Sequence, residues 1–511
     1  MKSKPSICTG IFGSADFCRR ITLAIRNATL NCHTCSGLLS DAWSSILSEK
    51  PHIVICEIGL YHNAQTHEAL RQLLSRLRDR HGNEQVVIVA LTAPSNLAYG
   101  GDLLFANDTE MTPSGFVDMF IAGVPDNLPS LPPLAEQVHD VIRSYISEIA
   151  RRQSGKPPLP ALADDGWAPS MASPQSRELW MQWLPRYARY VNESPVITGP
   201  TGTGKTNLAK ATHMLSGRTG PFVSITPRDF SSSELIQSEL FGAVAGAYTG
   251  AVDKWGLVKS AEGGTLFIDE LQSIDKDLQG KLITFIENKA YRRVGSSESI
   301  QADVRFAFAT NRTLSDMVES DILREDFAYR LERVELNLLP LNRRPLDVAA
   351  ALAYALAKIR RQRPQMRPIK GATRVAYKQL FCHSWPGNLR QLENATAQLC
   401  EVADIRDLDQ IDEQVVNTVF ESKLLGPAIT APEVISQAAS RLAQSSLQHQ
   451  LQSAEDSLEC FTTQLRDCAL EATGGDVERA AALLGESNNL MEIYTGSQVA
   501  KRAVAPFNQD R

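Results

Sequence analysis

One octapeptide organises the middle of this chain: Gly199-Pro200-Thr201-Gly202-Thr203-Gly204-Lys205-Thr206. It follows a short β-like run, Pro195–Thr198, and precedes a helical pattern, Asn207–Leu215. Its spacing matches G-x-x-x-x-G-K-[ST], in which glycines let backbone N–H groups surround phosphate oxygens and a helix N-terminus adds its positive dipole end. The strand and helix on either side favour a phosphate-binding loop over a glycine-rich turn without a ligand.

Two side chains of this loop and two later carboxylates have predicted roles in binding and hydrolysing ATP. We expect Lys205 to reach the β- and γ-phosphates and Thr206 to ligate Mg²⁺. Downstream, the apolar run Thr265–Ile268 ends in Asp269 and Glu270. A strand that delivers an Asp to the sheet edge can hold the Mg²⁺, and the adjacent Glu can polarise a water for attack on the γ-phosphate. ATP hydrolysis is therefore preferred over inactive ATP binding.

Composition excludes several classes of protein. The 511 residues suggest roughly three or four domains of ~100–200 residues each. With 43% hydrophobic and 22% charged residues the chain is not wholly disordered, and its net charge of -6 excludes a globally basic nucleic-acid coat. Nine cysteines, an odd number, favour a reducing compartment. Without an apolar run of about 20 residues or a signal-like start, we predict a cytoplasmic protein that does not enter membranes.

The chain divides into segments of different pattern. Its beginning alternates helical patterns, such as Glu68–Arg78 and Leu134–Ile149, with five β-like runs, which predicts βαβ units and a parallel sheet. The runs are Ser6–Phe12, Asn31–Ser36, His52–Ile58, Gln85–Leu91 and Val117–Ala122. The predicted domains are an α/β regulatory domain (1–150), a linker (151–175), an α/β core (176–345), a helical block (346–422), a second linker (423–455) and a mostly helical tail (456–511).

Three further segments identify a family. They are Glu239–Gly242, the hexapeptide Gly246-Ala247-Tyr248-Thr249-Gly250-Ala251, and Glu262–Glu270. In this order they closely resemble the AAA+ domain of bacterial enhancer-binding proteins, the NtrC-class activators of sigma-54 RNA polymerase, over about 176–400. The resemblance implies a P-loop core with a helical lid, assembly into a hexameric or heptameric ring, and contact of the hexapeptide with sigma-54. Two glycines beside one aromatic residue suit an exposed loop tip, and a tight loop that packs Tyr248 internally is the alternative.

The same resemblance implies roles for residues outside the loop. Asn311 would sense the γ-phosphate, and Arg324 and Arg330 would be arginine fingers that reach the nucleotide of the next subunit. Guanidinium suits that role because it is permanently charged and contacts phosphate through two parallel hydrogen bonds. A surface ion pair is the alternative for either one. Within Trp385–Asn394, which matches the lid motif, Arg390 would be the second sensor.

Three positions depart from the family pattern, and the first two concern coupling between the site and the loop. Thr226 stands where the family has an Asn that holds the catalytic Glu, and Ala243–Ala245 replaces His-Glu-Lys. Gln391 replaces a Glu of the lid motif. The residues of hydrolysis are intact, but we expect the coupling to differ.

The N-terminal domain resembles a response-regulator receiver whose phosphorylation chemistry is missing. Glu57 occupies the position of the acceptor Asp, Ile11–Ser14 lacks the acidic pair, and Met119–Gly123 has no Lys at its end. An acyl phosphate needs the Mg²⁺ held by those acids and the charge of that Lys. We therefore predict that a protein, a small ligand or a second copy of the domain is the input, or that the domain is structural.

The tail resembles the start of a Fis-type helix-turn-helix. Gly474-Gly475 would end one helix and Asp476 would begin the next, but residues 486–496, where the reading helix belongs, hold no Arg or Lys. Phosphate and base contacts favour cationic side chains, so we predict weak binding to enhancer DNA.

Three functions are consistent with these patterns. The preferred one is an ATP-driven activator that remodels sigma-54 RNA polymerase. The second is a DNA-silent AAA+ regulator in a heteromer with a partner activator that recognises the promoter. The third is a P-loop remodeller of another protein.

Overall fold

The computed structural model describes most of the N-terminal domain and all of the central region. The described residues are 7–27, 32–37, 51–58, 64–81, 86–104, 119–122, 134–153, 171–421, 462–463, 465–470, 480–481 and 484. The predicted linker 423–455 and the reading helix at 486–496 lie outside them. The chain forms two compact units, Met1–Arg374 with Trp385–Ile411, and Val375–Ser384 with Asp412–Arg511.

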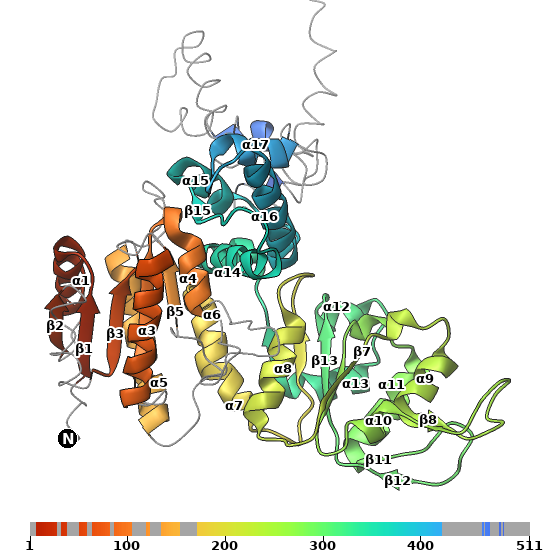
Figure 1. Cartoon of the computed structure of the whole chain (residues 1–511). Coiled ribbons are helices and arrows are strands. Elements are labelled where there is room, and N and C mark those ends of the chain that lie inside the picture. The colour runs from red at the N-terminus through yellow and green to blue at the C-terminus, as the bar shows by residue number, and fades with distance from the viewer. Residues whose placement is uncertain are drawn as a thin grey trace, which may run out of the picture. The chain divides into compact units, whose positions relative to one another are not determined.

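The N-terminal domain is a parallel sheet of five strands in the order β2-β1-β3-β4-β5 (Figure 1). Its strands are β1 (Ile7–Phe12), β2 (Cys32–Gly37), β3 (Ile53–Glu57), β4 (Val87–Thr92) and β5 (Met119–Ala122). Its helices are α1 (Ala15–Asn27), α3 (Ala64–His81), α4 (Leu97–Leu104) and α5 (Leu134–Gln153), and a 3-10 turn, η1 (Pro94–Asn96), precedes α4. This strand order is that of a doubly wound domain, so the predicted receiver-like fold is confirmed.

A second parallel sheet forms the core, in the order β14-β6-β13-β10-β7. Its strands are β6 (Val196–Thr198), β7 (Phe222–Ile225), β10 (Thr265–Ile268), β13 (Arg305–Thr310) and β14 (Glu335–Asn337). Its helices are α6 (Pro174–Glu178), the π-helical η2 (Leu179–Trp183), α7 (Leu184–Ala188), α8 (Lys205–Ser216), α9 (Ser233–Phe241), α10 (Leu257–Ser260), α11 (Lys276–Asn288), α12 (Leu314–Glu319) and α13 (Glu325–Leu331). The 3-10 turns are η3 (Pro227–Asp229), η4 (Leu271–Ser273), η5 (Glu332–Val334) and η6 (Leu341–Arg343).

Aromatic side chains join the sheet to the helices on one of its faces. Phe306 and Phe308 of β13 stack with ring centroids 5.9 Å apart. Phe285 of α11 meets Phe306 edge-on at 5.0 Å, and Phe327 of α13 meets Phe308 edge-on at 5.6 Å. Edge-to-face pairs of this kind stabilise a core beyond the area they bury. They fix α11 and α13 against the central strand.

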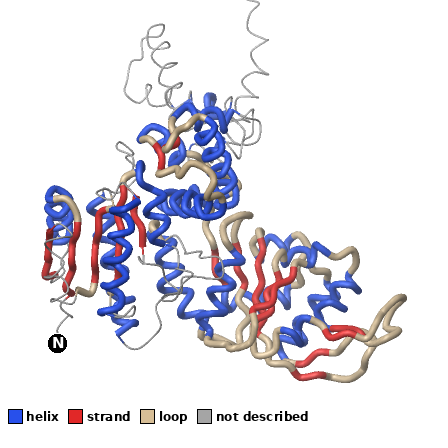
Figure 2. The backbone as a smooth tube through the Cα atoms, viewed as in Figure 1, coloured by secondary structure: helices blue, strands red, loops and turns tan. Residues whose placement is uncertain are grey.

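Two short ribbons lie at one end of the core, and a long loop extends beyond them (Figure 2). One ribbon pairs β8 (Gly242–Ala243) with β9 (Lys254–Trp255), and the other pairs β11 (Ala290–Tyr291) with β12 (Ile300–Gln301). The loop between β8 and β9 contains the hexapeptide. It therefore projects from the core, as the family resemblance predicts.

A helical lid follows the core sheet. It consists of α14 (Leu346–Gln362), α15 (Arg374–Cys382), α16 (Asn388–Ile405) and α17 (Glu413–Glu421), with a two-residue parallel bridge between β15 (Gly371–Ala372) and β16 (Gln410–Ile411). Of the predicted helical stripe Leu352, Ala355, Leu356 and Ile359, the first three side chains are buried. The second compact unit contains most of α15 together with α17, and within it His383 stacks on Phe420 with centroids 4.8 Å apart. The predicted α/β core with a helical lid is confirmed.

A buried arginine at the start of β13 is bound to the segment that connects α7 to β6. Arg305 is 1% exposed, and its guanidinium donates to the carbonyls of Tyr187, Ala188, Tyr190 and Glu193 at 3.0–3.2 Å. Burial lowers its pKa to about 10, so the side chain stays cationic near neutral pH. Two of these carbonyls belong to the end of α7 and two follow it, where the chain turns back into the sheet. Arg305 therefore closes that turn.

We expect Arg305→Met to destabilise the core by more than about 3 kcal/mol, because each buried carbonyl left without a partner costs about 1–3 kcal/mol. The melting temperature of the full chain should fall by roughly 6 °C or more. Arg333→Met is the matched control, since Arg333 is 57% exposed and its ion pair within the described part of the chain is with Glu193 at 3.1 Å. Equal melting temperatures of the two variants would contradict this role for Arg305.

Candidate active site

A cavity of about 280 Å³ lies at the carboxyl ends of β6, β10 and β13. Its walls are Thr201, Gly202, Gly204, Lys205, Thr206, Asn207, Asp269, Glu270, Gln272, Asn311, Leu389, Arg390 and Glu393. Ligands of open α/β sheets bind at this edge, where the strand order reverses. The cavity brings together the phosphate loop, the two carboxylates and both predicted sensors, which are separated widely in the sequence.

The phosphate loop has the backbone geometry that its glycines suggest. Gly202 has φ of +79°, and a Cβ there would lie 2.4 Å from the carbonyl oxygen of Gly387 in the lid. The Lys205 ammonium donates to the carbonyls of Gly199 at 2.8 Å and Pro200 at 3.1 Å. Burial lowers the pKa of Lys205, and Asp269 opposes that shift. Bound phosphate oxygens would replace these carbonyls as acceptors.

The two carboxylates differ in how they are held. Asp269 Oδ1 accepts the backbone N–H of Glu270 at 2.8 Å. Glu270 has φ of +56° and ψ of +55°, a left-handed conformation that is strained for a residue with a side chain and is commonly found at functional sites. Glu270 Oε1 lies 3.7 Å from Nη1 of Arg228, a residue for which the sequence analysis predicts no role.

The lid closes on the phosphate loop through Asn388, another residue whose role the sequence did not predict. Asn388 is buried, and its amide donates to the carbonyl of Thr201 at 2.9 Å while its Oδ1 accepts the N–H of Leu341 at 2.7 Å. The N–H of Leu389 also donates to the carbonyl of Gly202 at 3.0 Å. These bonds bring the first turn of α16, and Arg390 with it, to the wall of the cavity.

Gln391, which replaces the family's Glu, can still accept a hydrogen bond from the backbone of the lid motif. Gln391 Oε1 accepts the N–H of Gly387 at 2.8 Å. A carboxylate oxygen would accept the same bond, and only the negative charge is lost. The lid motif is therefore structurally intact at this position.

The two predicted fingers lie outside the phosphate cavity. Arg324 is 43% exposed and pairs with both carboxylate oxygens of Asp326, at 3.0 and 2.7 Å. Among the described residues, Nε of Arg330 has no hydrogen-bond partner. Arg324 lines a larger cavity of about 890 Å³, which it shares with four other cations: Lys276, Lys281, Arg292 and Arg293.

Gln279, which the sequence did not single out, positions the first finger. It is fully buried on α11, and its amide donates to the carbonyls of Ile274 and Ile322, both at 2.9 Å. Its Oε1 accepts the N–H of Arg324 at 2.9 Å. Two hydrogen bonds of the Gln279 side chain therefore hold the backbone at Ile322 and Arg324 against α11.

The hexapeptide is an exposed turn with one anchored side chain. The N–H of Ala251 donates to the carbonyl of Tyr248 at 2.9 Å, and Thr249 at the tip is exposed. The Tyr248 hydroxyl donates to Oγ of Ser238 on α9 at 3.1 Å. Exposure of the tip agrees with the exposed loop that the sequence predicts. The half-buried Tyr248 is tethered to α9 through its phenolic hydroxyl.

Ala243–Ala245 lack the charged side chains of the family pattern, and charged residues elsewhere form ion pairs around the base of the hexapeptide loop. Arg293, in the loop after β11, pairs with Asp253 at 2.7 Å and lies over the ring of Trp255, 4.6 Å from its centroid. Lys254 pairs with Glu239 of α9 at 2.9 Å. The base of the hexapeptide loop is therefore linked to its surroundings from its C-terminal side.

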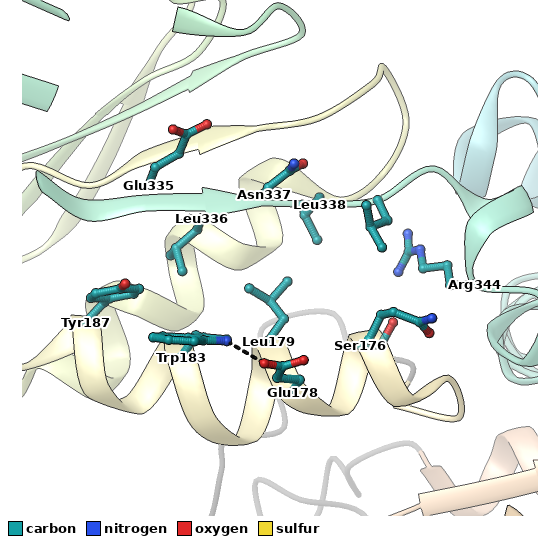
Figure 3. Close-up of a pocket in the computed structure, with 12 residues that line it drawn as sticks. Ser176, Glu178, Leu179, Trp183, Tyr187, Glu335, Leu336, Asn337, Leu338 and Arg344 are labelled. Carbon is teal, nitrogen blue, oxygen red and sulfur yellow. Dashed lines mark hydrogen bonds between the residues drawn. The ribbon is translucent and has the colours of Figure 1, made fainter. Parts of the chain in front are cut away.

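A third cavity, of about 360 Å³, lies between the α6–α7 segment and β14 (Figure 3). Trp183, Tyr187 and Leu336 line it, and Trp183 Nε1 donates to Glu178 at 3.1 Å. Arg344 at its wall donates to the carbonyl of Thr203 in the phosphate loop at 3.1 Å. None of the predicted catalytic residues lines it, so the phosphate cavity is the candidate active site.

The receiver-like domain uses its acceptor-position residue for structure. Glu57 Oε2 accepts both the backbone N–H of Ser14, at 2.8 Å, and the Ser14 hydroxyl, at 2.9 Å. Ser14 directly precedes α1, where a carboxylate also benefits from the helix dipole. The carboxylate is therefore bound within the domain.

A parallel P-loop sheet with a helical lid over its phosphate cavity defines an AAA+ nucleotide-binding core. The Sigma-54 interaction domain family matches residues 174–337, so the segment that holds the core sheet is similar to that domain. Within the described ranges, no group of three or more His, Cys, Asp or Glu side chains could hold a metal ion, and none of the helices is long and apolar enough to span a membrane.

Several known proteins are similar to this chain. Alginate biosynthesis transcriptional regulatory protein AlgB of Pseudomonas aeruginosa is 36% identical over 243 residues, covering 47% of this chain and 54% of that protein. The Nif-specific regulatory protein of Azotobacter vinelandii is 38% identical over 224 residues (43% and 42%). A crystal structure of NtrX from Brucella abortus with ADP has 21% identity over 96% of this chain and 99% of that one, with a TM-score of 0.46. The chain spans about half the length of the curated relatives it matches.

We expect a small-molecule phosphodonor to leave no base-labile adduct on the N-terminal domain, because the Glu57 carboxylate is occupied by Ser14 and lacks the Mg²⁺ ligands of a receiver. Intact-mass measurement after incubation, with an authentic receiver as positive control, checks this. A mass increase of one phosphoryl group that Glu57→Gln abolishes would show that the prediction is wrong.

Proposed function

We propose that this chain is a sigma-54-dependent transcription activator that hydrolyses ATP in an oligomeric AAA+ ring to remodel sigma-54 RNA polymerase. The observation that supports it best is the single cavity shared by the phosphate loop, Asp269, Glu270, Asn311 and Arg390. The match of residues 174–337 to the Sigma-54 interaction domain gives the class of target. RNA polymerase is the partner in this proposal, and the cytoplasm is the place of action.

The cavity provides a group for each requirement of ATP hydrolysis. The Lys205 ammonium and the backbone N–H groups of the loop bind the phosphates, and Asn311 senses the γ-phosphate. Glu270 accepts a proton from the attacking water. Mg²⁺ fits the oxygen donors present, because the Thr206 hydroxyl and the Asp269 carboxylate both line the cavity. When bound, it neutralises charge on the phosphates.

Ring assembly completes the site in this proposal. Arg324 and Arg330 lie away from the phosphate cavity of their own subunit, while Arg324 is exposed on a surface rich in cations. In the ring, the exposed Arg324 guanidinium binds the triphosphate held by the adjacent subunit. Asp326 keeps Arg324 ordered until that contact forms.

The projecting hexapeptide makes the contact with sigma-54. Thr249 is exposed at its tip, and the glycines on either side leave the turn unobstructed: a Cβ added at Gly246 or Gly250 would meet nothing within 4 Å among the described residues. Enhancer DNA contact through 456–511 is weak in this proposal, because residues 486–496 hold no Arg or Lys.

Transcription from a sigma-54 promoter tests the proposal with purified protein. Wild type should give ATP-dependent open complexes. Thr249→Ala should retain most ATP turnover but lose activation, because Thr249 lies at the loop tip rather than in the phosphate cavity. Thr418→Ala, an exposed threonine of α17, is the matched control. Activation by Thr249→Ala at the wild-type level would contradict the role of the hexapeptide.

Subunit mixing tests the fingers. Lys205→Ala and Arg324→Ala should each be nearly inactive alone, since an arginine finger is worth about 10³–10⁵ in rate. Mixed, they should recover part of the ATPase rate, because some interfaces then combine an intact phosphate loop with an intact finger. Wild-type ATP turnover by Arg324→Ala alone would show that the assignment is wrong.

A further inference from the structure

We propose that Arg228 is a positioning residue that restrains Glu270 in a resting orientation and so limits the rate of ATP hydrolysis. The inference rests on the proposed ATPase function and adds a residue to which neither the sequence pattern nor the similarity to known proteins gives a role. It is carried by the ion pair between these two side chains.

The parallel sheet brings the two residues together. β7 and β10 are neighbours, and the N–H of Asp269 donates to the carbonyl of Ile225 at 3.0 Å. The chain leaves β7 through η3, which contains Arg228, and leaves β10 through Asp269 and Glu270. Two segments that follow adjacent strands therefore end at the same edge of the sheet, with a cation on one and the catalytic carboxylate on the other.

The backbone of Glu270 leaves its side chain few directions. Its φ is +56°, and its N–H is bound by the carboxylate of Asp269. In this conformation Oε1 lies 3.7 Å from Nη1 of Arg228, and the Glu270 side chain is 33% exposed. Attack on the γ-phosphate requires that carboxylate to accept a proton from water, and the guanidinium competes for the same oxygen.

Arg228 acts from outside the cavity. Glu270 lines the phosphate cavity, whereas Arg228 does not, and its side chain is 76% exposed. Thr226, at the position where the family has Asn, forms no hydrogen bond with Glu270 among the described contacts, and its side chain does not cap η3. Among the described residues, Glu270 therefore pairs with a cation two residues after Thr226, and this cation lies outside the wall of the phosphate cavity.

The strength of the restraint follows from its exposure. An exposed ion pair without ideal geometry changes an equilibrium by roughly two- to five-fold. Arg228 therefore slows turnover moderately and does not block it. Nucleotide binding is unaffected, because Arg228 does not line the cavity that holds the phosphate-binding groups.

The test is steady-state ATP hydrolysis by the full chain under conditions of ring assembly. Arg228→Gln and Arg228→Ala should raise kcat about two- to five-fold and leave KM and the affinity for a non-hydrolysable ATP analogue within about two-fold. Arg228→Lys should stay near the wild-type kcat, because it keeps the charge. Arg333→Ala is the matched control, since it breaks an ion pair of similar exposure, Arg333–Glu193, away from the cavity.

The outcomes separate this inference from the proposed function. A wild-type chain that binds ATP in a ring but does not hydrolyse it would contradict the proposed function itself. If wild type is active, an unchanged or lowered kcat in both neutral variants overturns the role of Arg228. The same increase in Arg228→Lys as in Arg228→Gln also overturns it, because the restraint would then not depend on charge.

Discussion

The clamp between the lid and the phosphate loop is the contact on which the candidate active site depends. Asn388 bonds to Thr201 on one side and to Leu341 on the other, and Leu389 bonds to Gly202. Without these bonds, Arg390 would have no fixed place beside the phosphates. A small rotation of α16 would displace the phosphate loop and Arg390 together, because both line the same cavity. In this way the position of the lid can depend on the bound nucleotide.

The parallel sheet supplies the other half of the site. Because all five strands run in one direction, each strand end delivers its next residues to one edge: Asp269 after β10 and Asn311 after β13. The sequence could predict these positions, since an apolar run followed by acids or by Asn is a local pattern. The same holds for the alternating runs of the N-terminal domain, whose strands lie within a residue or two of their predicted bounds.

Residues that act over long sequence distances could not be predicted in this way. Gln279 and Arg305 are buried polar residues, and the carbonyls that accept from them lie between 5 and 118 residues away in the sequence. Arg228 resembles any surface cation until the register of β7 against β10 places it beside Glu270. Likewise, the sequence indicates that charges are missing from Ala243–Ala245, but only the structure shows Arg293 in contact with Asp253 and Trp255.

One segment connects the hydrolysis site to the loop that projects from the core. It begins at η3 with Arg228 beside Glu270, continues as α9, and reaches Ser238, which accepts the hydroxyl of Tyr248. Ile236, Leu240 and Phe241 of α9 are buried in the core, so the helix is held firmly against it. Arg228 lies in η3 before α9, and Ser238 lies in the last turn of α9, so the ion pair with Glu270 and the tether of the hexapeptide belong to one continuous segment. In this chain the hexapeptide is therefore linked, through the Tyr248 hydroxyl, to the segment that also carries Arg228.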